Sequence, residues 1–274
     1  MDHNTYIPKL AKIIEIKEEV GGARPIKTFR TQFLSTNDFS FRSGQCAMLS
    51  VFGRGESMIS ISSSPLLKEY LQFSILKMGR VTSSLHDMQV GDLIGIRGPY
   101  GNSFPMEDWK GKNIIFIGGG IGLAPIWSVL NTALGKKGDY GDLMLIYGAR
   151  TSQDIVFKKE LEELKKQMPV HLSIDVEEPD WKEFVGFVPQ NVTDKKPSSK
   201  DAIAVTCGPP IMIKFVIKAL EELGFKDEQI YTTVENKMKC GIGKCGRCNI
   251  GFHYVCKDGP VYSWAELKKL PQEY

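Results

Sequence analysis

A group of four cysteines near the C-terminus constrains this chain more than any other feature. They are Cys240, Cys245, Cys248 and Cys256, and their spacing is C-x4-C-x2-C-x7-C. This spacing is typical of plant-type iron–sulfur sites, in which a tight loop wraps one edge of a cluster and a later cysteine completes the ligand set. Glycines interleave with the first three cysteines, as expected where the backbone needs positive φ angles and must come close to inorganic sulfides. The pattern therefore predicts a 2Fe-2S centre.

A zinc site with four cysteine ligands is the alternative for the same residues. Zinc sites more often pair two C-x2-4-C knuckles across a longer gap than this sequence has. Lys244 and Arg247 place positive charge beside the cysteines, which suits an anionic cluster. A 2Fe-2S centre moves one electron at a time, so the rest of the chain is expected to hold groups that exchange electrons with it.

Length and composition set the class of protein. The 274 residues are enough for two domains and a small appendage. The 42% hydrophobic and 24% charged residues are typical of a soluble globular protein, and the net charge of +3 favours neither nucleic acid nor an anionic membrane as a partner. The N-terminus lacks a signal-peptide pattern and the apolar runs are too short to span a bilayer. We therefore expect a cytoplasmic protein without membrane insertion.

Residues 1–105 are predicted to form an antiparallel β-barrel domain. The expected strands lie at residues 11–20, 25–34, 47–52, 58–62, 70–76 and 93–97. Two segments of this domain carry groups that could bind a cofactor. The Ser-rich stretch 56–64 could hydrogen-bond a ring edge or a ribityl chain, or it could be an ordinary edge strand. The turn and helix start at 79–85 suit a phosphate, or Thr82 or Ser83 could simply cap the helix.

Residues 106–236 are predicted to form an α/β domain that binds a nucleotide on a parallel sheet. The apolar strand 113–117 runs into Gly118, Gly119, Gly120 and Gly122 and then into an apolar helix. Strand, glycine turn and helix are the parts of a dinucleotide site, because the helix start favours phosphate and glycine admits it. Ligands bind at the carboxyl ends of such strands. Cys207 lies at one of them, where it could face a nicotinamide or pack as a small apolar residue.

Taken in order, these motifs resemble those of the ferredoxin–NADP reductase family. Within it, the chain is most similar to a subfamily with a C-terminal 2Fe-2S module. That subfamily includes the gamma subunit of sulfhydrogenases, the B component of anaerobic sulfite reductases and, more distantly, the electron-transfer subunit of heteromeric dihydroorotate dehydrogenase. The strings GPPIMIKF and GKCGRCNIGFHYVCKDGPVYSW carry the likeness to the first two, and the resemblance spans nearly the whole chain.

The resemblance implies FAD on the barrel, NAD or NADP on the α/β domain, and the cluster in a module at residues 237–274. It places the flavin motif at Ser60, Ile61, Ser62 and Ser63, and the flavin phosphate at Gly79, Val81, Thr82 and Ser83. It places the nucleotide pyrophosphate at the glycine turn 118–122 and the nicotinamide beside Cys207, Gly208 and Pro209. Arg150 could meet a 2′-phosphate or stack on adenine, so NAD and NADP both stay open.

The chain departs from the family pattern ahead of the flavin. The family motif is Arg-x-aromatic-Ser/Thr, whereas residues 57–60 read Ser-Met-Ile-Ser. The Arg that would pair with the flavin phosphates and the ring that would stack on the flavin are both missing. Arg54 or Arg80 is a candidate for the missing charge.

The resemblance implies an electron relay. A hydride passes between NAD(P)H and the flavin, and single electrons pass between the flavin and the 2Fe-2S cluster, to or from a partner catalytic subunit of hydrogenase or sulfite reductase type. Glu235, just before the cysteine loop, is expected near the flavin or as a surface carboxylate. Tyr262 and Trp264 could dock a partner or pack against the barrel. The alternatives are a stand-alone reductase and a non-enzymatic, zinc-stabilised regulatory subunit.

Overall fold

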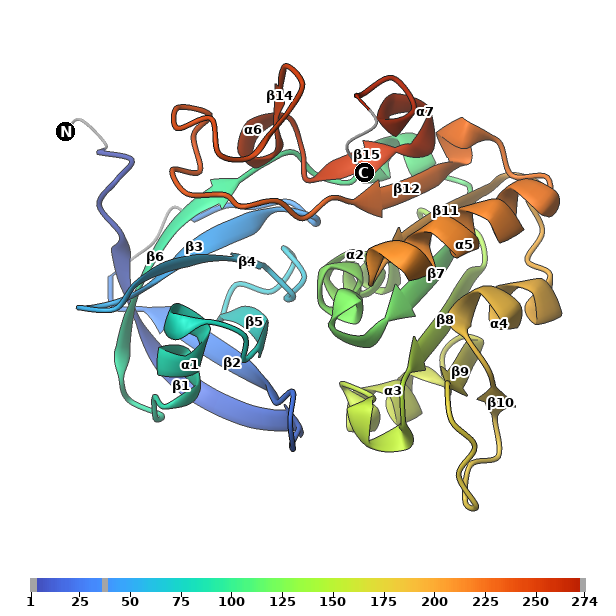
Figure 1. Cartoon of the computed structure of the whole chain (residues 1–274), viewed down its shortest axis with the longest axis horizontal. Helices are drawn as coiled ribbons and strands as arrows, with labels where there is room; N and C mark the ends of the chain where they lie inside the picture. Colours follow the sequence, from blue (N-terminus) through green and yellow to red (C-terminus); the bar gives the residue numbers. More distant parts are fainter. Residues whose placement is uncertain (1–3, 36–38, 272–274) are drawn as a thin grey trace.

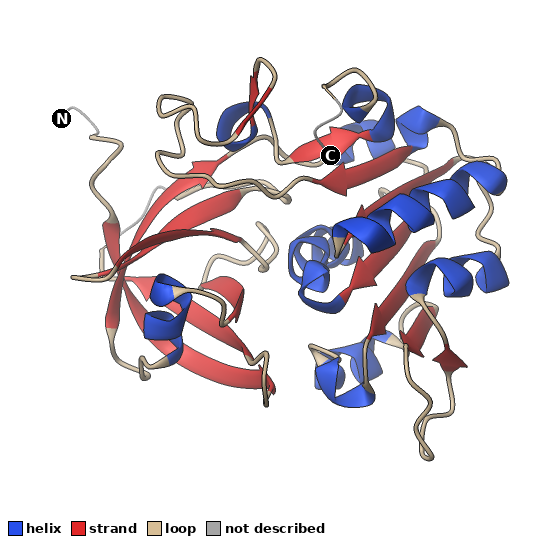
Figure 2. Cartoon of the chain, in the orientation of Figure 1, coloured by secondary structure: helices blue, strands red, loops and turns tan. Residues whose placement is uncertain are grey.

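The computed structural model describes residues 4–35 and 39–271. Two units lie side by side, and the C-terminal segment runs across the top of both (Figure 1). The first unit is almost entirely strand, whereas the second alternates strands with helices (Figure 2). The predicted fold class, an antiparallel barrel-like sheet followed by a parallel α/β sheet and a small C-terminal module, is confirmed.

The first unit is a curled antiparallel sheet with strand order β4-β3-β6-β1-β2-β5 over the described residues. Its elements are β1 (Lys9–Val20), β2 (Ile26–Phe33), β3 (Cys46–Val51), β4 (Gly55–Ser60), β5 (Leu71–Leu76), α1 (Arg80–His86) and β6 (Leu93–Tyr100). Beyond β4, the amide of Ser62 donates to the carbonyl oxygen of Gln72 at 2.8 Å, which brings the two edges of the sheet together. Alternate side chains such as Phe29 and Phe73 fill the interior with 1% exposure or less, as the period of a half-buried strand requires.

The second unit is a mostly parallel sheet of order β10-β9-β8-β7-β11-β12-β15 over the described residues, in which β15 (Val261–Ser263) comes from the C-terminal segment. Its strands are β7 (Asn113–Gly119), β8 (Leu143–Ala149), β9 (Val170–Ile174), β10 (Phe184–Val185), β11 (Ala202–Cys207) and β12 (Ile230–Thr233). Its helices are α2 (Leu123–Gly135), α3 (Lys158–Leu164), α4 (Val188–Lys195) and α5 (Pro210–Glu222), with short 3-10 turns η1 (Met106–Trp109), η2 (Gly120–Gly122), η3 (Ser152–Asp154) and η4 (Asp227–Gln229). The apolar cluster beneath α2 and α3 and the one beneath α4 and α5 cover opposite faces of the sheet. This two-faced burial explains why β7 and β11 read as continuous apolar runs.

The third helix starts later than the sequence pattern predicts. The amphipathic pattern of residues 154–166 predicts a helix that begins at Asp154, but α3 begins at Lys158, because Phe157 has a left-handed backbone with φ of 57°. The amide of Phe157 donates to a carboxylate oxygen of Glu19 at 3.0 Å. A contact with the barrel therefore sets the start of this helix. The hydrophobic periodicity of the sequence around residue 157 cannot predict a contact with a residue so far away in the chain.

The C-terminal segment is joined to both units. It contains β13 (Asn249–Ile250), β14 (His253–Tyr254), α6 (Val255–Asp258), β15 (Val261–Ser263) and α7 (Trp264–Leu267). Strand β15 pairs antiparallel with β12, so it extends the sheet of the α/β unit. On the barrel side, the amide nitrogen of Asn102 donates to the carbonyl oxygens of Asp258 and Val261 at 3.0 and 2.7 Å. The glycines and prolines of segment 98–105 predict a linker between two folding units, and the structure shows that this segment also clamps the cysteine module.

Candidate functional site

A large cavity lies where the parallel strands of the α/β unit end beside the barrel. Its volume is about 1000 Å³, and its walls come from both units. The barrel contributes Val20, Ile26, Leu76 and Met78 at the facing ends of β1, β2 and β5. The residues predicted from sequence that line it are Gly119, Gly120, Gly122, Arg150, Cys207, Gly208, Pro209 and Glu235. Motifs from separate segments of the chain thus meet at one site.

The glycine turn after β7 needs its small residues for close packing. A Cβ on Gly122 would lie 2.5 Å from the carbonyl oxygen of Cys207, so glycine lets the start of α2 approach the end of β11. Gly118 does not line the cavity. It lies below, still within β7, where an added Cβ would be 3.2 Å from the ring of Tyr147. The backbone that a ligand can reach therefore begins at Gly119.

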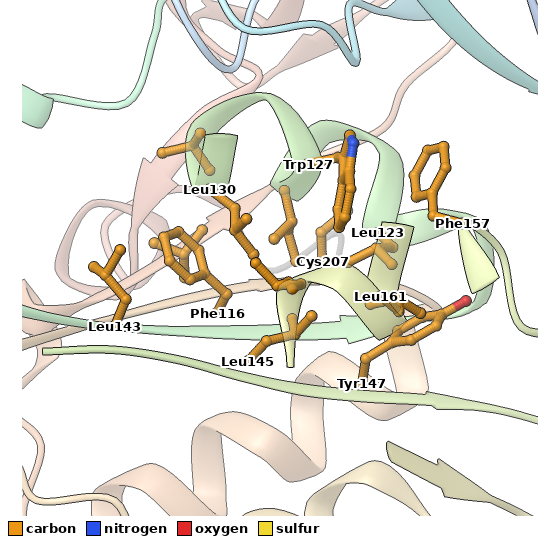
Figure 3. Packing of buried hydrophobic residues seen from close by; sticks show 14 of the residues in the cluster. Phe116, Leu123, Trp127, Leu130, Leu143, Leu145, Tyr147, Phe157, Leu161 and Cys207 are labelled. Atoms are coloured by element: carbon orange, nitrogen blue, oxygen red, sulfur yellow. The ribbon is translucent and has the colours of Figure 1, made fainter. Parts of the chain in front are cut away.

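Cys207 and Glu235, the two predicted catalytic residues, lie close together. Cys207 is 4% exposed and belongs to the apolar cluster beneath α2 that includes Leu123 and Trp127 (Figure 3). The Thr233 hydroxyl donates to its sulfur at 3.0 Å. Burial and, to a smaller extent, the charge of Glu235 raise the pKa of the Cys207 thiol to about 12, against the opposing effect of the Thr233 hydrogen bond. Cys207 is therefore a neutral thiol near pH 7, not a nucleophilic thiolate.

The cavity has an acidic and aromatic rim beside β8 and β9 that the sequence pattern did not predict. Asp154 and Asp175 line it together with Arg150. Burial raises the pKa of Asp175, an effect that Arg150 opposes and Asp154 reinforces. Phe187 and Phe215, which are 60% and 50% exposed, line the same cavity. Asp175 directly follows β9, and that position at a strand end was the signal available in the sequence.

The hydroxyl-rich segment after β4 divides into an accessible part and a buried part. Ser60, at the end of β4, is half-buried, whereas Ile61 is 1% exposed and belongs to the barrel core. The Ser63 hydroxyl accepts from the amide of Gln72 at 3.1 Å, and its carbonyl accepts from the Ser128 hydroxyl of α2 at 2.7 Å. Ser62 is fully buried beside the same glutamine side chain. The structure thus engages Ser63 in the contact between the two units and Ser62 in a contact within the barrel.

The turn before α1 is organised by Thr82. Its hydroxyl oxygen accepts from the amides of Met78 and Gly79 at 2.9 and 2.8 Å, so the threonine does cap the turn. The same geometry leaves the first amides of α1, including those of Val81 and Thr82, without acceptors inside the helix. Arg80 extends toward Gly55, the first residue of β4. Its Nη2 atom lies 3.9 Å from the point that a Cβ would occupy if Gly55 carried a side chain. Arg80 therefore reaches the strand that carries the altered flavin motif.

The cysteine loop is lined with amides that point at sulfur. Sγ of Cys240 accepts from the amides of Ile242, Lys244 and Cys245 at 3.4, 3.3 and 3.4 Å. Sγ of Cys256 accepts from the amide of Gly243 at 3.2 Å. Burial raises the pKa of Cys240, but these backbone donors outweigh it and lower the pKa to about 6. Cys240 is thus prepared to be a thiolate, the form that binds metal.

The four thiols fall into two pairs. The Cys240 thiol lies beside that of Cys245, and the Cys256 thiol lies beside that of Cys248. Among residues 4–35 and 39–271, no three His, Cys, Asp or Glu side chains gather around a single point as ligands of one metal ion. A pair of thiols for each of two irons is the donor set that a 2Fe-2S cluster needs. The residues therefore fit the predicted cluster.

The two aromatic residues considered as docking groups are used inside the molecule. Tyr262 is 3% exposed and packs with Cys248 and Cys256 in the core of the cysteine module. The indole nitrogen of Trp264 donates to Glu221 of α5 at 2.9 Å. Trp264 therefore packs on the α/β unit, and the alternative that it packs against the barrel is wrong.

Comparison with known proteins places the chain in a family. Residues 116–218 match the model of the oxidoreductase NAD-binding domain, and residues 235–268 match the iron–sulfur cluster binding domain of dihydroorotate dehydrogenase B. Sulfhydrogenase 2 subunit gamma of Pyrococcus furiosus is 38% identical, with 95% of this chain and 96% of the relative covered. A probable dihydroorotate dehydrogenase B (NAD(+)) electron transfer subunit of the same organism is 34% identical, with 93% and 91% covered.

Solved structures share the fold. A chain from the NADH-dependent reduced ferredoxin–NADP oxidoreductase superposes with a TM-score of 0.74 at 21% identity, over 100% of this chain and 95% of that one. The ferredoxin–NADP⁺ reductase of Plasmodium falciparum gives 0.69 at 20% identity, over 83% and 96%. Within the described residues, no helix has the length and apolar character to cross a membrane. The two relatives described above are 38% and 34% identical over more than nine-tenths of this chain. The chain therefore belongs to the family of NAD(P)H-dependent, iron–sulfur electron-transfer subunits that includes the sulfhydrogenase gamma subunits and the electron-transfer subunits of dihydroorotate dehydrogenase B.

Proposed function

We propose that this protein is the subunit of a cytoplasmic redox complex that exchanges electrons between NAD(H), FAD and a 2Fe-2S cluster on one side and a catalytic subunit of hydrogenase or sulfite reductase type on the other. One observation carries the proposal. A single cavity is lined by the nucleotide glycines, by the barrel edge and by Glu235, which begins the segment leading to the cluster cysteines.

The residues that line the cavity contribute by holding the nucleotide and the flavin in position for electron transfer. When bound, FAD supplies the conversion between a hydride pair and single electrons. The amides of Gly119, Gly120 and Gly122 and the start of α2 hold the nucleotide pyrophosphate. Cys207 and Glu235 border the nicotinamide, and the neutral thiol presents a small surface without charge against the ring. Leu76 and Met78 line the same cavity from the barrel side.

We assign NAD as the preferred nucleotide. In dinucleotide sites, an acidic residue after a strand accepts from the ribose 2′-hydroxyl, whereas a 2′-phosphate needs compensating positive charge. Here Arg150 is accompanied by two carboxylates, Asp154 and Asp175, that line the same cavity. A 2′-phosphate placed among them would be repelled. Phe187 and Phe215 offer aromatic faces on which adenine can stack.

Ser60 and Arg80 are the residues we assign to FAD in place of the altered motif. Ser60 is the accessible hydroxyl of the segment, and Arg80 reaches β4 from the phosphate turn. A guanidinium that arrives from α1 can pair with the flavin pyrophosphate without the missing arginine of β4.

We place the docking face for the catalytic subunit at the cluster loop. Phe252, at the turn between β13 and β14, is 101% exposed. The exposed charged residues of the segment 235–257 are Glu235, Lys237, Lys239, Lys244, Arg247 and Lys257. Cations outnumber carboxylates five to one in that segment, so the expected partner surface is acidic with an apolar pocket for Phe252.

Cofactor analysis of the purified chain tests the proposal. We expect about two irons, about two acid-labile sulfides and about one FAD per chain. A colourless protein that contains zinc in place of iron would favour the alternative of a non-enzymatic, zinc-stabilised regulatory subunit. A coloured protein that purifies alone and reduces free ferredoxin at full rate would favour the stand-alone reductase instead.

A further inference from the structure

Arg97 of β6 is a buried cation that joins the barrel to the cluster loop. Its side chain is 5% exposed. The guanidinium donates to both carboxylate oxygens of Glu56, from Nε at 2.9 Å and from Nη2 at 2.6 Å. Nη1 also donates to the carbonyl oxygen of Cys240 at 2.8 Å, and Nη2 donates to that of Lys239 at 3.4 Å. One side chain thus contacts the strand of the flavin motif and the first cluster cysteine.

The Arg97 guanidinium is 5% exposed, whereas its partner Glu56 keeps a third of its side chain exposed. Moving the guanidinium out of water carries a free-energy cost, so an apolar contact of similar volume would be a more favourable way merely to hold the two segments together. Two parallel hydrogen bonds nevertheless join the Arg97 guanidinium to the Glu56 carboxylate. Such a paired contact fixes the orientation of the guanidinium and also stabilises the ion pair. The Arg97 hydrogen bond is the main effect that lowers the pKa of Glu56, so both groups are charged near pH 7. A fixed positive charge therefore lies directly under the cluster loop.

Neighbouring residues make this contact rigid. The Tyr100 hydroxyl accepts from Nη1 of Arg97 at 2.8 Å, and the Tyr100 ring lies under the cysteine loop, where a Cβ on Gly241 would be 2.9 Å from it. Met238 and Ile242, on either side of Cys240, pack against Cys46, Met48 and Tyr100. Figure 1 shows the C-terminal segment passing across this side of the barrel, beside β3 and β6. The floor of the loop is thus set by the barrel.

We propose that Arg97, oriented by Glu56, is a positioning residue that fixes Cys240 relative to the flavin-binding strand and raises the reduction potential of the 2Fe-2S cluster. The inference rests on the proposed cluster in this loop. Reduction adds one negative charge to the cluster, and a buried positive charge nearby stabilises the reduced form more than the oxidised form. Glu56 acts in the opposite sense, since its carboxylate partly offsets the same field.

Opposite changes of charge provide the test. The midpoint potential of the cluster is measured on the full chain by a redox titration that follows the EPR signal of the reduced cluster, with iron content determined on the same samples. Arg97→Gln is expected to shift the potential to more negative values, and Glu56→Gln to more positive values. Arg97→Lys keeps the charge and is expected to shift it less than Arg97→Gln. Arg30→Gln, which breaks an ion pair with Glu15 on another part of the barrel, is the control.

The outcomes separate the inference from the proposed function. A wild-type chain without iron would overturn the proposed function itself. Loaded variants with the wild-type potential, or with shifts of the same sign for Arg97→Gln and Glu56→Gln, would overturn the electrostatic role of Arg97. If Arg97→Gln fails to retain iron, Glu56→Gln decides: a positive shift supports the inference, and an unchanged or negative shift contradicts it.

Discussion

At the residue scale, burial separates the groups that can meet a ligand from those that hold the fold. Ser62 and Ser63 satisfy their hydroxyls or carbonyls inside the protein, whereas Ser60 and Asp175 stay accessible. Cys207 belongs to both groups, because it is 4% exposed and packs in the core, and yet it lines the cavity. These environments decide which substitutions should change the chemistry and which should change the nucleotide or flavin that binds.

The thiol of Cys207 should contribute to hydride transfer without titrating. Replacing Cys207 by Ala is expected to slow reduction of the flavin by NADH roughly tenfold with little change in KM, since it alters the surface at the nicotinamide and not the adenosine contacts. Because burial raises the Cys207 pKa to about 12, the ratio of wild-type to variant rates should stay flat from about pH 6 to 9. Stopped-flow reduction across this range measures it. A wild-type inflection near pH 8 that the variant lacks would contradict the neutral thiol.

The carboxylate of Asp175 should discriminate against NADPH. Asp175→Ser is expected to raise kcat/KM for NADPH relative to NADH roughly tenfold, because removing one nearby charge relieves about 1–2 kcal/mol of repulsion on a 2′-phosphate. Asp180→Ser, in the exposed loop beyond the cavity lining, is the matched control. An unchanged NADPH-to-NADH ratio in Asp175→Ser would remove Asp175 from nucleotide selection.

The guanidinium of Arg80 should hold FAD. Arg80→Ala is expected to weaken FAD binding roughly tenfold, the value of about 1.5 kcal/mol for a hydrogen bond to a charged group. Flavin retained after extended dialysis, measured by absorbance, reports it. Arg54→Ala is the comparison that distinguishes the two arginines considered from sequence. Retention that falls only in Arg54→Ala would transfer the role to Arg54.

At the element scale, the cysteine module is built into both larger units. Strand β15 completes the sheet of the α/β unit beside β12, and Asn102 clamps the turn before β15 from the barrel side. A Cβ on Gly101, which has φ of +81°, would meet the carbonyl oxygen of Gly259 at 2.5 Å. The loop after β6 therefore needs glycine to approach the module.

Removing this clamp should loosen the cluster. Asn102→Ala leaves the part-buried carbonyl oxygens of Asp258 and Val261 without the donor that Asn102 supplies, which costs about 2 kcal/mol. Iron release to a chelator is expected to accelerate roughly tenfold or more as a result. Asn131→Ala, which removes a bond within α2 alone, is the control and should release iron at the wild-type rate. Equal release from both variants would show that the clamp does not hold the module.

Local chemistry predicted much of this arrangement, and long-range contacts account for the rest. The cysteine spacing, the apolar β7 and the glycine turn were recognisable because each is a contiguous pattern with one physical explanation. The start of α3, the pairing of β15 with β12 and the Arg97–Glu56 pair depend on residues far apart in sequence. Nothing in a local window marks Arg97 as different from a solvated arginine. Asp175 was missed because a carboxylate after a short strand is common.

At the scale of the whole molecule, the charge on the cluster face should control transfer to the partner. The double variant Lys244→Glu and Arg247→Glu is expected to slow electron transfer to an acidic ferredoxin several-fold and to reduce its dependence on salt, because steering by exposed charges is screened above about 0.1 M. Reduction of the flavin by NADH should be unaffected. Lys166→Glu, on the exposed surface just after α3, is the control. A rate to ferredoxin that ignores both charge reversal and salt would move the docking face elsewhere.

The central claim is that electrons entering from NADH reach the cluster within this one chain. The most direct test is to mix the purified, oxidised protein anaerobically with NADH, freeze it at successive times and record EPR and visible spectra. We expect the flavin to bleach first and the signal of a reduced 2Fe-2S cluster to follow, with NADPH acting more slowly than NADH. A flavin that bleaches while the cluster stays oxidised, in a chain shown to reduce with dithionite, would contradict the relay.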